Sequence, residues 1–186
     1  MPAPHLHTPR LLLRPLAPSD ERFYRGLYAD PVVMRHVAAP LAPAATLRAF
    51  RVVLEQLAAD PPLARYWILC PRAGDDDLGL MAWVQDRDDA GSAEVGVLLV
   101  AAAECRGYAT EALAALADAV FAGPAQRRLW TRHARDNGPA VGLMRKLGFA
   151  PMADADGGPA PLRWQLERQA WLARQGPVFA SLPANC

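Results

Sequence analysis

The sequence predicts a mixed α/β fold in which one central sheet is mostly antiparallel and contains one parallel pair of strands. Three strand-like runs, 65–70, 78–85 and 93–100, are separated by short turn-rich stretches, which is typical of antiparallel hairpins. A helical pattern over 108–121 then leads to a strand at 128–133. A strand–helix–strand unit places its two strands parallel, and the helices are expected to flank the sheet.

The amino-terminal part predicts one strand followed by two helices. Residues 10–16 contain a leucine run and form the strand. A helix is expected to begin near Ser19, which can cap it, and to run to about Tyr28, before an Asp-Pro pair. Apolar residues at helical spacing predict a second helix over 46–58, after a proline-rich turn.

The carboxyl-terminal part predicts a helix, an extended run that starts at 149–151, a turn and a last strand. Asn137 opens the helix, which ends at Leu147, because Gly148 can adopt the left-handed conformation of a helix cap. Residues 154–158 are rich in Asp and Gly and predict a turn, and 162–168 predict the final strand. The order of elements contains no internal repeat and no linker.

Length and composition limit the classes of function. The 186 residues suit a single domain, 1–186, with a core over about 8–171 and a tail over 172–186. The net charge of +1 argues against a nucleic-acid partner, and no apolar run is long enough to span a membrane. The amino terminus lacks the pattern of a signal peptide. A homodimer is compatible with the sequence.

The three cysteines, Cys70, Cys105 and Cys186, show neither metal-ligand spacing nor a disulfide framework. No metal site is therefore expected. Three scattered thiols favour a reducing compartment, and we expect a cytoplasmic protein.

The most informative segment is the loop 105–107, which runs directly into the helix that begins at Tyr108. A glycine at a helix start leaves backbone N–H groups free at the positive end of the helix dipole, and Arg106 adds a positive charge. Such a junction can hold a phosphate or pyrophosphate. The segment lacks the patterns of a P-loop and of a dinucleotide fingerprint. A helix-entry turn without a ligand has the same local sequence, so the loop alone leaves both interpretations open.

Two motifs together resemble the GNAT superfamily of acetyl-CoA-dependent N-acetyltransferases. Residues 107–112, Gly-Tyr-Ala-Thr-Glu-Ala, match the common form of the family's cofactor loop. In the second motif, which begins at Asn137, Lys146, Gly148 and Phe149 fall in register with the family pattern. The resemblance implies a GNAT-like fold with a splayed parallel pair of strands, and acetyl-CoA as the cofactor.

Further segments resemble one branch of that superfamily, the ribosomal-protein N-terminal (Rim-type) acetyltransferases. These segments are 8–20, 30–34, 94–96 and 162–171. The resemblance spans roughly 8–171. It implies a primary amine as the acceptor, either a protein N-terminus or a small molecule, attacked by direct transfer in a ternary complex.

Three positions depart from the family pattern. Glu104 stands where Gln or Arg is usual, and a carboxylate near a pyrophosphate is repulsive, so its side chain is expected to point away. Cys105 replaces a common small glycine. Ala140 stands where a serine usually assists the departing thiolate, so no hydroxyl is available there.

The resemblance assigns cofactor contacts to three segments. Backbone N–H groups of the strand before the loop hold the thioester carbonyl, those of the loop hold the pyrophosphate, and the second motif contacts the pantetheine arm and the adenosine phosphates. Asn137 can equally be a plain helix cap, Lys146 a cation at a helix end, and Tyr108 a packing residue. The assigned residues are Leu98, Leu99, Val100, Cys105, Arg106, Gly107, Tyr108, Ala109, Thr110, Asn137 and Lys146.

Two residues are candidates for the base that deprotonates the amine. Glu94 lies on the strand that carries the thioester donors, a few residues before them. His133 lies at the end of the next strand, and imidazole titrates near neutral pH. The alternatives are a solvated acidic side chain for Glu94 and an exposed histidine at a loop edge for His133.

Two functions are compatible with this pattern. The first is an active N-acetyltransferase. The second is a module that binds acyl-CoA with little or no turnover and acts as a sensor, which the departures at Glu104 and Ala140 motivate.

Overall fold

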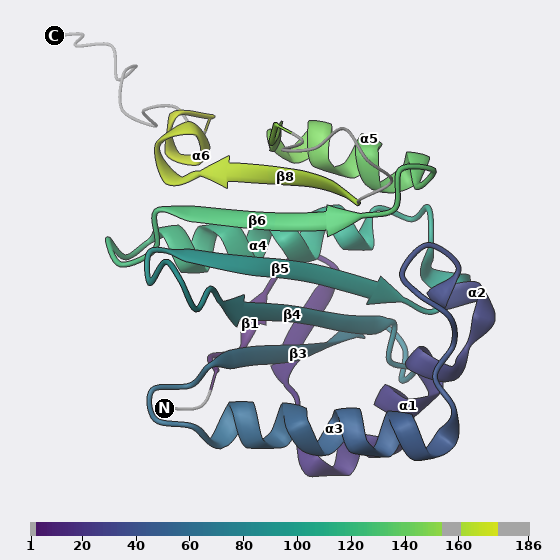
Figure 1. Cartoon of the computed structure of the whole chain (residues 1–186). Helices are drawn as coiled ribbons and strands as arrows, with labels where there is room; N and C mark the ends of the chain where they lie inside the picture. The colour runs from purple at the N-terminus through teal and green to yellow at the C-terminus, as the bar shows by residue number, and fades with distance from the viewer. Residues whose placement is uncertain (1–2, 154–160, 175–186) are drawn as a thin grey trace, which may run out of the picture.

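The computed structural model describes residues 3–153 and 161–174 of the chain. In these residues a single sheet of eight strands runs through the molecule, in the order β1-β2-β3-β4-β5-β6-β8-β7 (Figure 1). The strands are β1 (Leu6–His7), β2 (Leu11–Pro15), β3 (Ala64–Pro71), β4 (Gly79–Gln85), β5 (Ser92–Leu99), β6 (Arg128–His133), β7 (Ala150–Pro151) and β8 (Leu162–Glu167). The helices are η1 (Pro18–Asp20), α1 (Glu21–Ala29), α2 (Pro31–Met34), α3 (Pro43–Ala58), η2 (Ala101–Ala103), α4 (Tyr108–Phe121), α5 (Gly138–Leu147) and α6 (Arg168–Arg174).

The sheet confirms the predicted fold class. Every neighbouring pair of strands is antiparallel except β5 and β6, which are parallel. The parallel pairing covers only Ser92 to Glu94 on β5 and Arg128 to Trp130 on β6. Beyond Glu94 the two strands diverge, so the carboxyl-terminal half of β5 has no strand partner on the β6 side.

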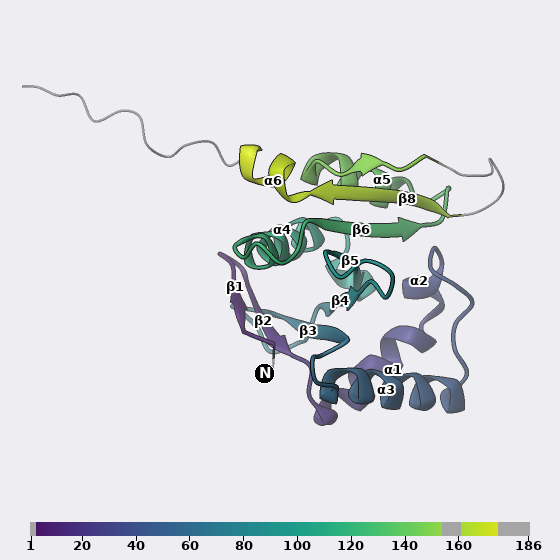
Figure 2. The ribbon, with the colours of Figure 1, turned by 60° about the vertical axis from the view of Figure 1, so that its left-hand side comes forward.

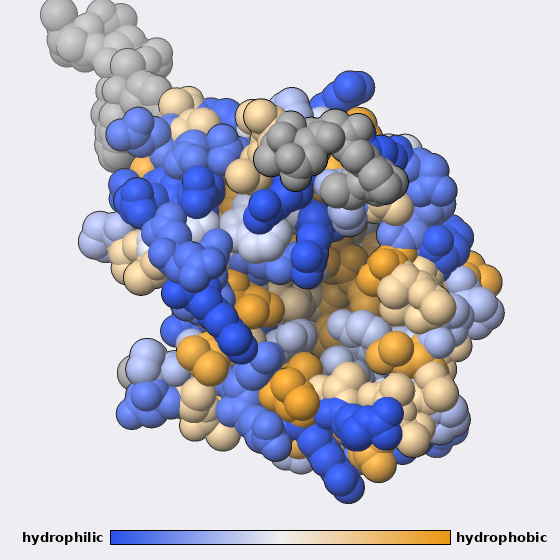
Figure 3. Space-filling view, viewed as in Figure 1, coloured by the Kyte–Doolittle hydropathy of each residue, from blue (hydrophilic) through white to orange (hydrophobic). Residues whose placement is uncertain are grey.

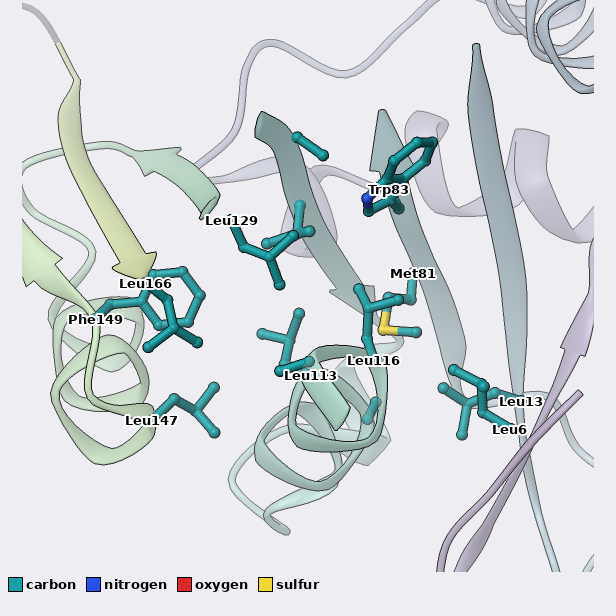
Figure 4. Close-up of a cluster of buried hydrophobic side chains, with 14 of the residues drawn as sticks. Leu6, Leu13, Met81, Trp83, Leu113, Leu116, Leu129, Leu147, Phe149 and Leu166 are labelled. Carbon is teal, nitrogen blue, oxygen red and sulfur yellow. The ribbon is translucent and has the colours of Figure 1, made fainter. Parts of the chain in front are cut away.

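Two hydrophobic cores hold the helices on opposite faces of the sheet (Figures 1 and 2). The larger core packs α4, α5 and α6, and Figure 4 shows Leu113 and Leu116 of α4 directed toward strand residues such as Met81. The smaller core packs α1 and α3, where Phe50 is almost fully buried. Phe149 is a buried member of the larger core.

Most element boundaries agree with the sequence to within a few residues, and the differences have local reasons. Helix α3 begins at Pro43, three residues before the expected start, because proline fits the first turn of a helix. Ser19 makes no capping hydrogen bond; the carboxylate of Asp20 instead accepts the N–H of Ala17 and binds Arg14.

Four short elements were not predicted. Strand β1 pairs with β2, η2 follows β5, α6 follows β8 directly, and α2 begins at Pro31. The carboxylate of Asp30 caps α2 by accepting the N–H groups of Val32 and Val33. The turn predicted at 154–158 and the tail beyond Arg174 lie outside the described residues. No helix in the described part of the chain is long and apolar enough to cross a membrane.

Candidate active site

The divergence of β5 and β6 opens two adjoining cavities. The first, of about 670 Å³, lies between the two strands and is bordered by α1, β3 and β4 as well. The second, of about 420 Å³, is bordered by the end of β5, the loop before α4 and the start of α5. The space-filling view shows a hollow with a hydrophobic floor between the upper and lower parts of the molecule (Figure 3).

The two cavities share a border. The shared residues come from the segment after α2, from β5 and from α5, which are distant in sequence. They are His36, Val37, Val97, Leu98, Asn137, Ala140 and Leu143. We call this shared border the junction. A molecule that enters through one cavity can meet a molecule from the other cavity only here.

The backbone of β5 presents free hydrogen-bonding groups at the junction. The N–H of Val100 donates to Leu78, and the carbonyl of Ser92 accepts from Asp86, so the even-numbered residues of β5 turn their backbone toward β4. Alternation along the strand then turns the backbone of Val97 and Leu99 toward β6, which has diverged at this point.

This register decides which of the predicted thioester donors have a free N–H. The N–H of Val100 is already donated, and Val100 borders neither cavity. Leu98 borders both cavities with its side chain, but its N–H points to β4. Leu99 and Val97 are therefore the residues of this segment with an open N–H, and Val97 is the one at the junction.

The loop before α4 has the backbone geometry of an anion site. Gly107 has φ of +80° and Cys105 has φ of +57°, both in the left-handed region. Gly107 supplies no capping side chain, and the first amides of α4, those of Tyr108, Ala109 and Thr110, have no acceptor one turn earlier. Cys105, Gly107, Ala109 and Thr110 border the second cavity.

Arg10, from the turn between β1 and β2, fixes this loop from behind. Its Nη1 donates to the carbonyl of Arg106 at 2.9 Å, and its guanidinium lies 4.6 Å from the ring centroid of Tyr108. A Cβ on Gly107 would lie 3.3 Å from Nη2 of Arg10. A side chain at 107 would therefore crowd the clamp as well as strain the backbone.

Glu111, in the first turn of α4, completes the clamp. Its carboxylate accepts from Nε of Arg10 at 2.6 Å, from the Arg10 backbone N–H at 2.8 Å and from the Thr8 hydroxyl at 2.5 Å. Burial alone raises the pKa of a carboxyl, but the hydrogen bonds from Thr8 and Arg10 and the charge of Arg10 outweigh it and hold the pKa of Glu111 below its usual value.

The carboxylate of Glu104 is paired with a guanidinium group. Its carboxylate forms two hydrogen bonds with Arg35, at 2.7 and 3.0 Å, and so joins the segment after α2 to the loop before α4. The predicted repulsion of a pyrophosphate by Glu104 is thereby reduced, because a guanidinium lies beside the carboxylate.

The remaining predicted cofactor residues divide into two groups. Asn137 borders both cavities and also caps α5, since its Oδ1 accepts the N–H of Ala140. Lys146 borders the second cavity. Arg106 and Tyr108 border neither cavity, and Tyr108 packs partly buried against the larger core. The second cavity therefore borders this region at Gly107 and at the first residues of α4.

Glu94 borders the first cavity and forms an ion pair. Its Oε1 lies 3.0 Å from Nε of Arg132, and the side chains are 30% and 60% exposed, respectively. Among the described residues, Glu94 is the one carboxylate residue that borders the first cavity, and Glu104 is the one that borders the second.

His133 also borders the first cavity, but it is a buried residue, 9% exposed, and not a histidine exposed at a loop edge. Its Nδ1 lies 2.9 Å from the carbonyl of Ala134, which can only accept, so Nδ1 carries a hydrogen. Its Nε2 is buried and has no hydrogen-bond partner in the described residues. Glu94 pairs with Trp130, and strand alternation puts His133 on the opposite face of the sheet from both. The side chains of the two base candidates, Glu94 and His133, therefore lie on opposite faces of the sheet.

Two tyrosines border the first cavity that the sequence did not indicate. Burial raises the pKa of Tyr28, and burial together with nearby charge raises the pKa of Tyr66 to about 12. Both phenols therefore remain neutral near pH 7. Their approach to β5 depends on how α1 and β3 pack across the sheet, which no local pattern reveals. No group of three or more His, Cys, Asp or Glu residues in the described ranges is arranged to hold a metal ion.

Comparisons with known proteins show which family and which solved structures this chain resembles. The family model described as the acetyltransferase (GNAT) domain matches residues 10–150. No curated protein sequence matches the chain significantly.

Solved structures with the same fold cover nearly the whole chain. An acetyltransferase from Agrobacterium tumefaciens is 25% identical, with a TM-score of 0.74 over 90% of this chain and 96% of its own. A spermidine N-acetyltransferase from Vibrio cholerae, solved with CoA and spermine, is 18% identical, with a TM-score of 0.74 over 89% and 99%. An acetyltransferase of the GNAT family from Chromobacterium violaceum is 21% identical, with a TM-score of 0.72 over 92% and 90%.

Proposed function

The chain belongs to the GNAT acetyltransferase family, and on this premise we propose that it moves an acetyl group from acetyl-CoA to a primary amine by direct attack in a ternary complex. The family makes it an acyltransferase that uses acetyl-CoA. The observation that carries the proposal is the junction, where two cavities meet beside the open N–H of Val97.

The residues of the second cavity fit acetyl-CoA. The free amides at the start of α4 suit its pyrophosphate, and the positive φ of Gly107 lets the backbone approach it closely. Asn137 and Lys146 lie along the same cavity. When bound, acetyl-CoA supplies a thioester whose C–S bond breaks as the amine nitrogen forms the new C–N bond.

The chain's own groups then have two tasks. The N–H groups of Val97 and Leu99 stabilise the negative charge that develops on the carbonyl oxygen. Glu94 accepts the proton that the amine loses, directly or through a water molecule. His133 is the second candidate for this role, with its unpartnered Nε2 on the other face of the sheet.

The charges of the first cavity favour an acceptor with a single ammonium group. Glu94 is the one carboxylate residue among the described residues that border this cavity, and Arg132 already pairs with it. A polyamine such as spermine, found in the Vibrio cholerae structure, would bring several positive charges for which the cavity offers no partner. A small monoamine, or a protein N-terminus as the Rim-type resemblance suggests, fits better. The predicted cytoplasmic location and homodimer stay predictions.

The alternative function, acyl-CoA binding with little turnover, is favoured by one observation. Ala140 lies at the junction, so the position where relatives have a serine offers no hydroxyl to the departing sulfur.

Thiol release from acetyl-CoA tests both functions. The purified protein is mixed with monoamines, polyamines and peptides with a free N-terminus, and each product is identified by mass spectrometry. The proposal expects turnover with at least one monoamine or peptide and a lower kcat/KM with spermine. Tight binding of acetyl-CoA without turnover on any amine would support the alternative.

A further inference from the structure

His36 is the one titratable side chain among the described residues of the junction. The other six junction residues carry apolar side chains or, at Asn137, an amide that cannot supply a proton. The bond that breaks joins the cofactor, from the second cavity, to the acetyl group that the acceptor attacks from the first. That bond must therefore lie at the junction, beside His36.

The two ring nitrogens of His36 have different surroundings. Nδ1 of His36 lies 3.6 Å from Oδ1 of Asp136 and is buried without a hydrogen bond in the described residues. The side chain keeps 27% of its surface exposed, and Nε2 is not among the buried nitrogen and oxygen atoms that lack a partner. One ring nitrogen therefore faces a carboxylate while the other is accessible. The carboxylate of Asp136 lies close to the ring without a hydrogen bond, and the Asp136 side chain is itself 81% exposed.

The backbone around His36 is held on two sides of the junction. Its neighbour Arg35 binds Glu104 in the loop before α4 and also donates to the carbonyl of Val32. Asp136 lies in the loop before α5, on the other side. The residue before His36 is thus tied to one side of the second cavity, and the imidazole lies near Asp136 on the other side.

On the premise of the proposed function, we propose that His36 is a catalytic residue that gives a proton from Nε2 to the departing sulfur, in place of the hydroxyl missing at Ala140. The C–N bond forms and the C–S bond breaks, with its electron pair left on sulfur. The sulfur takes the proton of His36, the amine nitrogen loses a proton to Glu94, and solvent restores the proton of His36. Asp136 is a positioning residue, since its Oδ1 lies 3.6 Å from Nδ1 of the ring.

Other titratable and charged groups around the two cavities also influence a pH profile. On the first cavity these are Tyr28, Tyr66, Glu94, Arg132 and His133, and on the second they are Arg35, Glu104, Cys105 and Lys146. A binding measurement that isolates the sulfur is therefore needed beside kinetics.

Calorimetry with CoA and desulfo-CoA, which lacks only the thiol, isolates that contact. We expect the wild-type protein to bind CoA about tenfold more tightly than desulfo-CoA, because a charge-assisted hydrogen bond forms to the sulfur. His36→Gln should remove this difference and leave the affinity for desulfo-CoA unchanged. A difference that persists in His36→Gln, or is absent in the wild type, overturns the proposal. The exposed His5, which borders neither cavity, provides the matched control His5→Gln.

Kinetics provide the second readout. His36→Gln should lower kcat about 100-fold with little change in the KM for acetyl-CoA, and Asp136→Asn should lower kcat a few-fold. Adding Ala140→Ser to His36→Gln should restore part of kcat, because the new hydroxyl reaches the same sulfur. An unchanged kcat in His36→Gln overturns the role while leaving the proposed function intact. A wild-type protein without any turnover, whose CoA preference still depends on His36, refutes the proposed function and keeps the contact.

Discussion

The two cavities that meet at the junction are built in different ways. The second cavity, which we propose holds acetyl-CoA and call the cofactor cavity, includes residues at the starts of α4 and α5, two glycines, and the loop that the Arg10–Glu111 clamp fixes. The first cavity, which we propose holds the acceptor and call the acceptor cavity, is bordered by residues of α1, β3, β4, β5 and β6 and of other elements, which meet only in the folded chain. A site made of backbone tolerates changes in side chains but depends on φ angles, whereas a site made of side chains can change its substrate without changing its fold.

Glu94→Gln acts on the acceptor cavity alone and should have the largest effect. The amide keeps the size of the side chain but cannot take the proton of the amine, so kcat should fall about 100-fold or more. The Kd for acetyl-CoA, measured by calorimetry, should stay within about twofold.

Glu21→Gln is the matched control, because Glu21 lies on α1 in an ion pair with Arg25 and borders neither cavity. If Glu94→Gln retains wild-type kcat, Glu94 is not the base, and His133→Gln becomes the next variant to measure.

Gly107→Val tests the backbone half of the comparison. Valine strongly disfavours the φ of +80° at this position, and its Cβ would crowd Arg10. We expect the Kd for acetyl-CoA to rise about 100-fold, while kcat at saturating acetyl-CoA changes much less. Gly123→Val, at a glycine with open space around its Cβ position and no positive φ, should leave the Kd unchanged. Equal effects of the two substitutions would mean that the loop conformation is not what binds the cofactor.

The loop before α4 could be predicted from the sequence, whereas much of the acceptor cavity could not. The loop 105–110 and the helix start at Asn137 are local: a glycine, a cap and a helical pattern specify them within a few residues. The parallel pair and its helix likewise follow from the order of elements. His36, Tyr28 and Tyr66 reach the acceptor cavity only because distant elements pack across the sheet, and no short motif contains them.

The donors on β5 illustrate a finer limit. The resemblance assigned Leu98, Leu99 and Val100 to the thioester carbonyl, but which amides are open depends on the register with β4. The hydrogen bonds of Ser92 and Val100 to their β4-side partners show that the backbone N–H groups of the odd-numbered residues face away from β4. A shift of one residue would have exchanged the roles of Val97 and Leu98.

Two glycines with open space around them separate the cavities directly. Gly96 borders only the acceptor cavity and Gly142 only the cofactor cavity, and a Cβ on either would meet no atom within 4 Å. Gly96→Leu should raise the KM for the amine about tenfold, and Gly142→Leu should raise the KM for acetyl-CoA by a similar factor, because each side chain fills one cavity.

Each glycine variant is the control for the other in steady-state kinetics that vary one substrate at a time. Gly142→Leu should also raise the melting temperature slightly, since leucine is a better helix former than glycine by about 1 kcal/mol. Exchanged effects on the two KM values would reverse the assignment of the cavities.

Glu111→Gln tests the clamp behind the cofactor loop and should have the smallest effect. Hydrogen bonds to a charged group contribute about 1.5–3 kcal/mol; the amide retains some of them, so we expect about 1 kcal/mol of lost stability near pH 7. Because the folded protein holds the pKa of Glu111 below the ordinary 4.5, the ionised carboxylate stabilises the fold above that pH. This contribution disappears as the pH falls through the lowered pKa.

The melting temperatures of the wild type and Glu111→Gln, measured from pH 7 to pH 3, should therefore converge at the acidic end. Glu55→Gln, at an exposed position on α3, should show no such convergence. A constant difference across the range would mean that the charge of Glu111 contributes nothing and that its shape alone supports the loop. Convergence, together with a few-fold rise in the KM for acetyl-CoA near pH 7, would tie the stability of this clamp to the backbone that binds the cofactor.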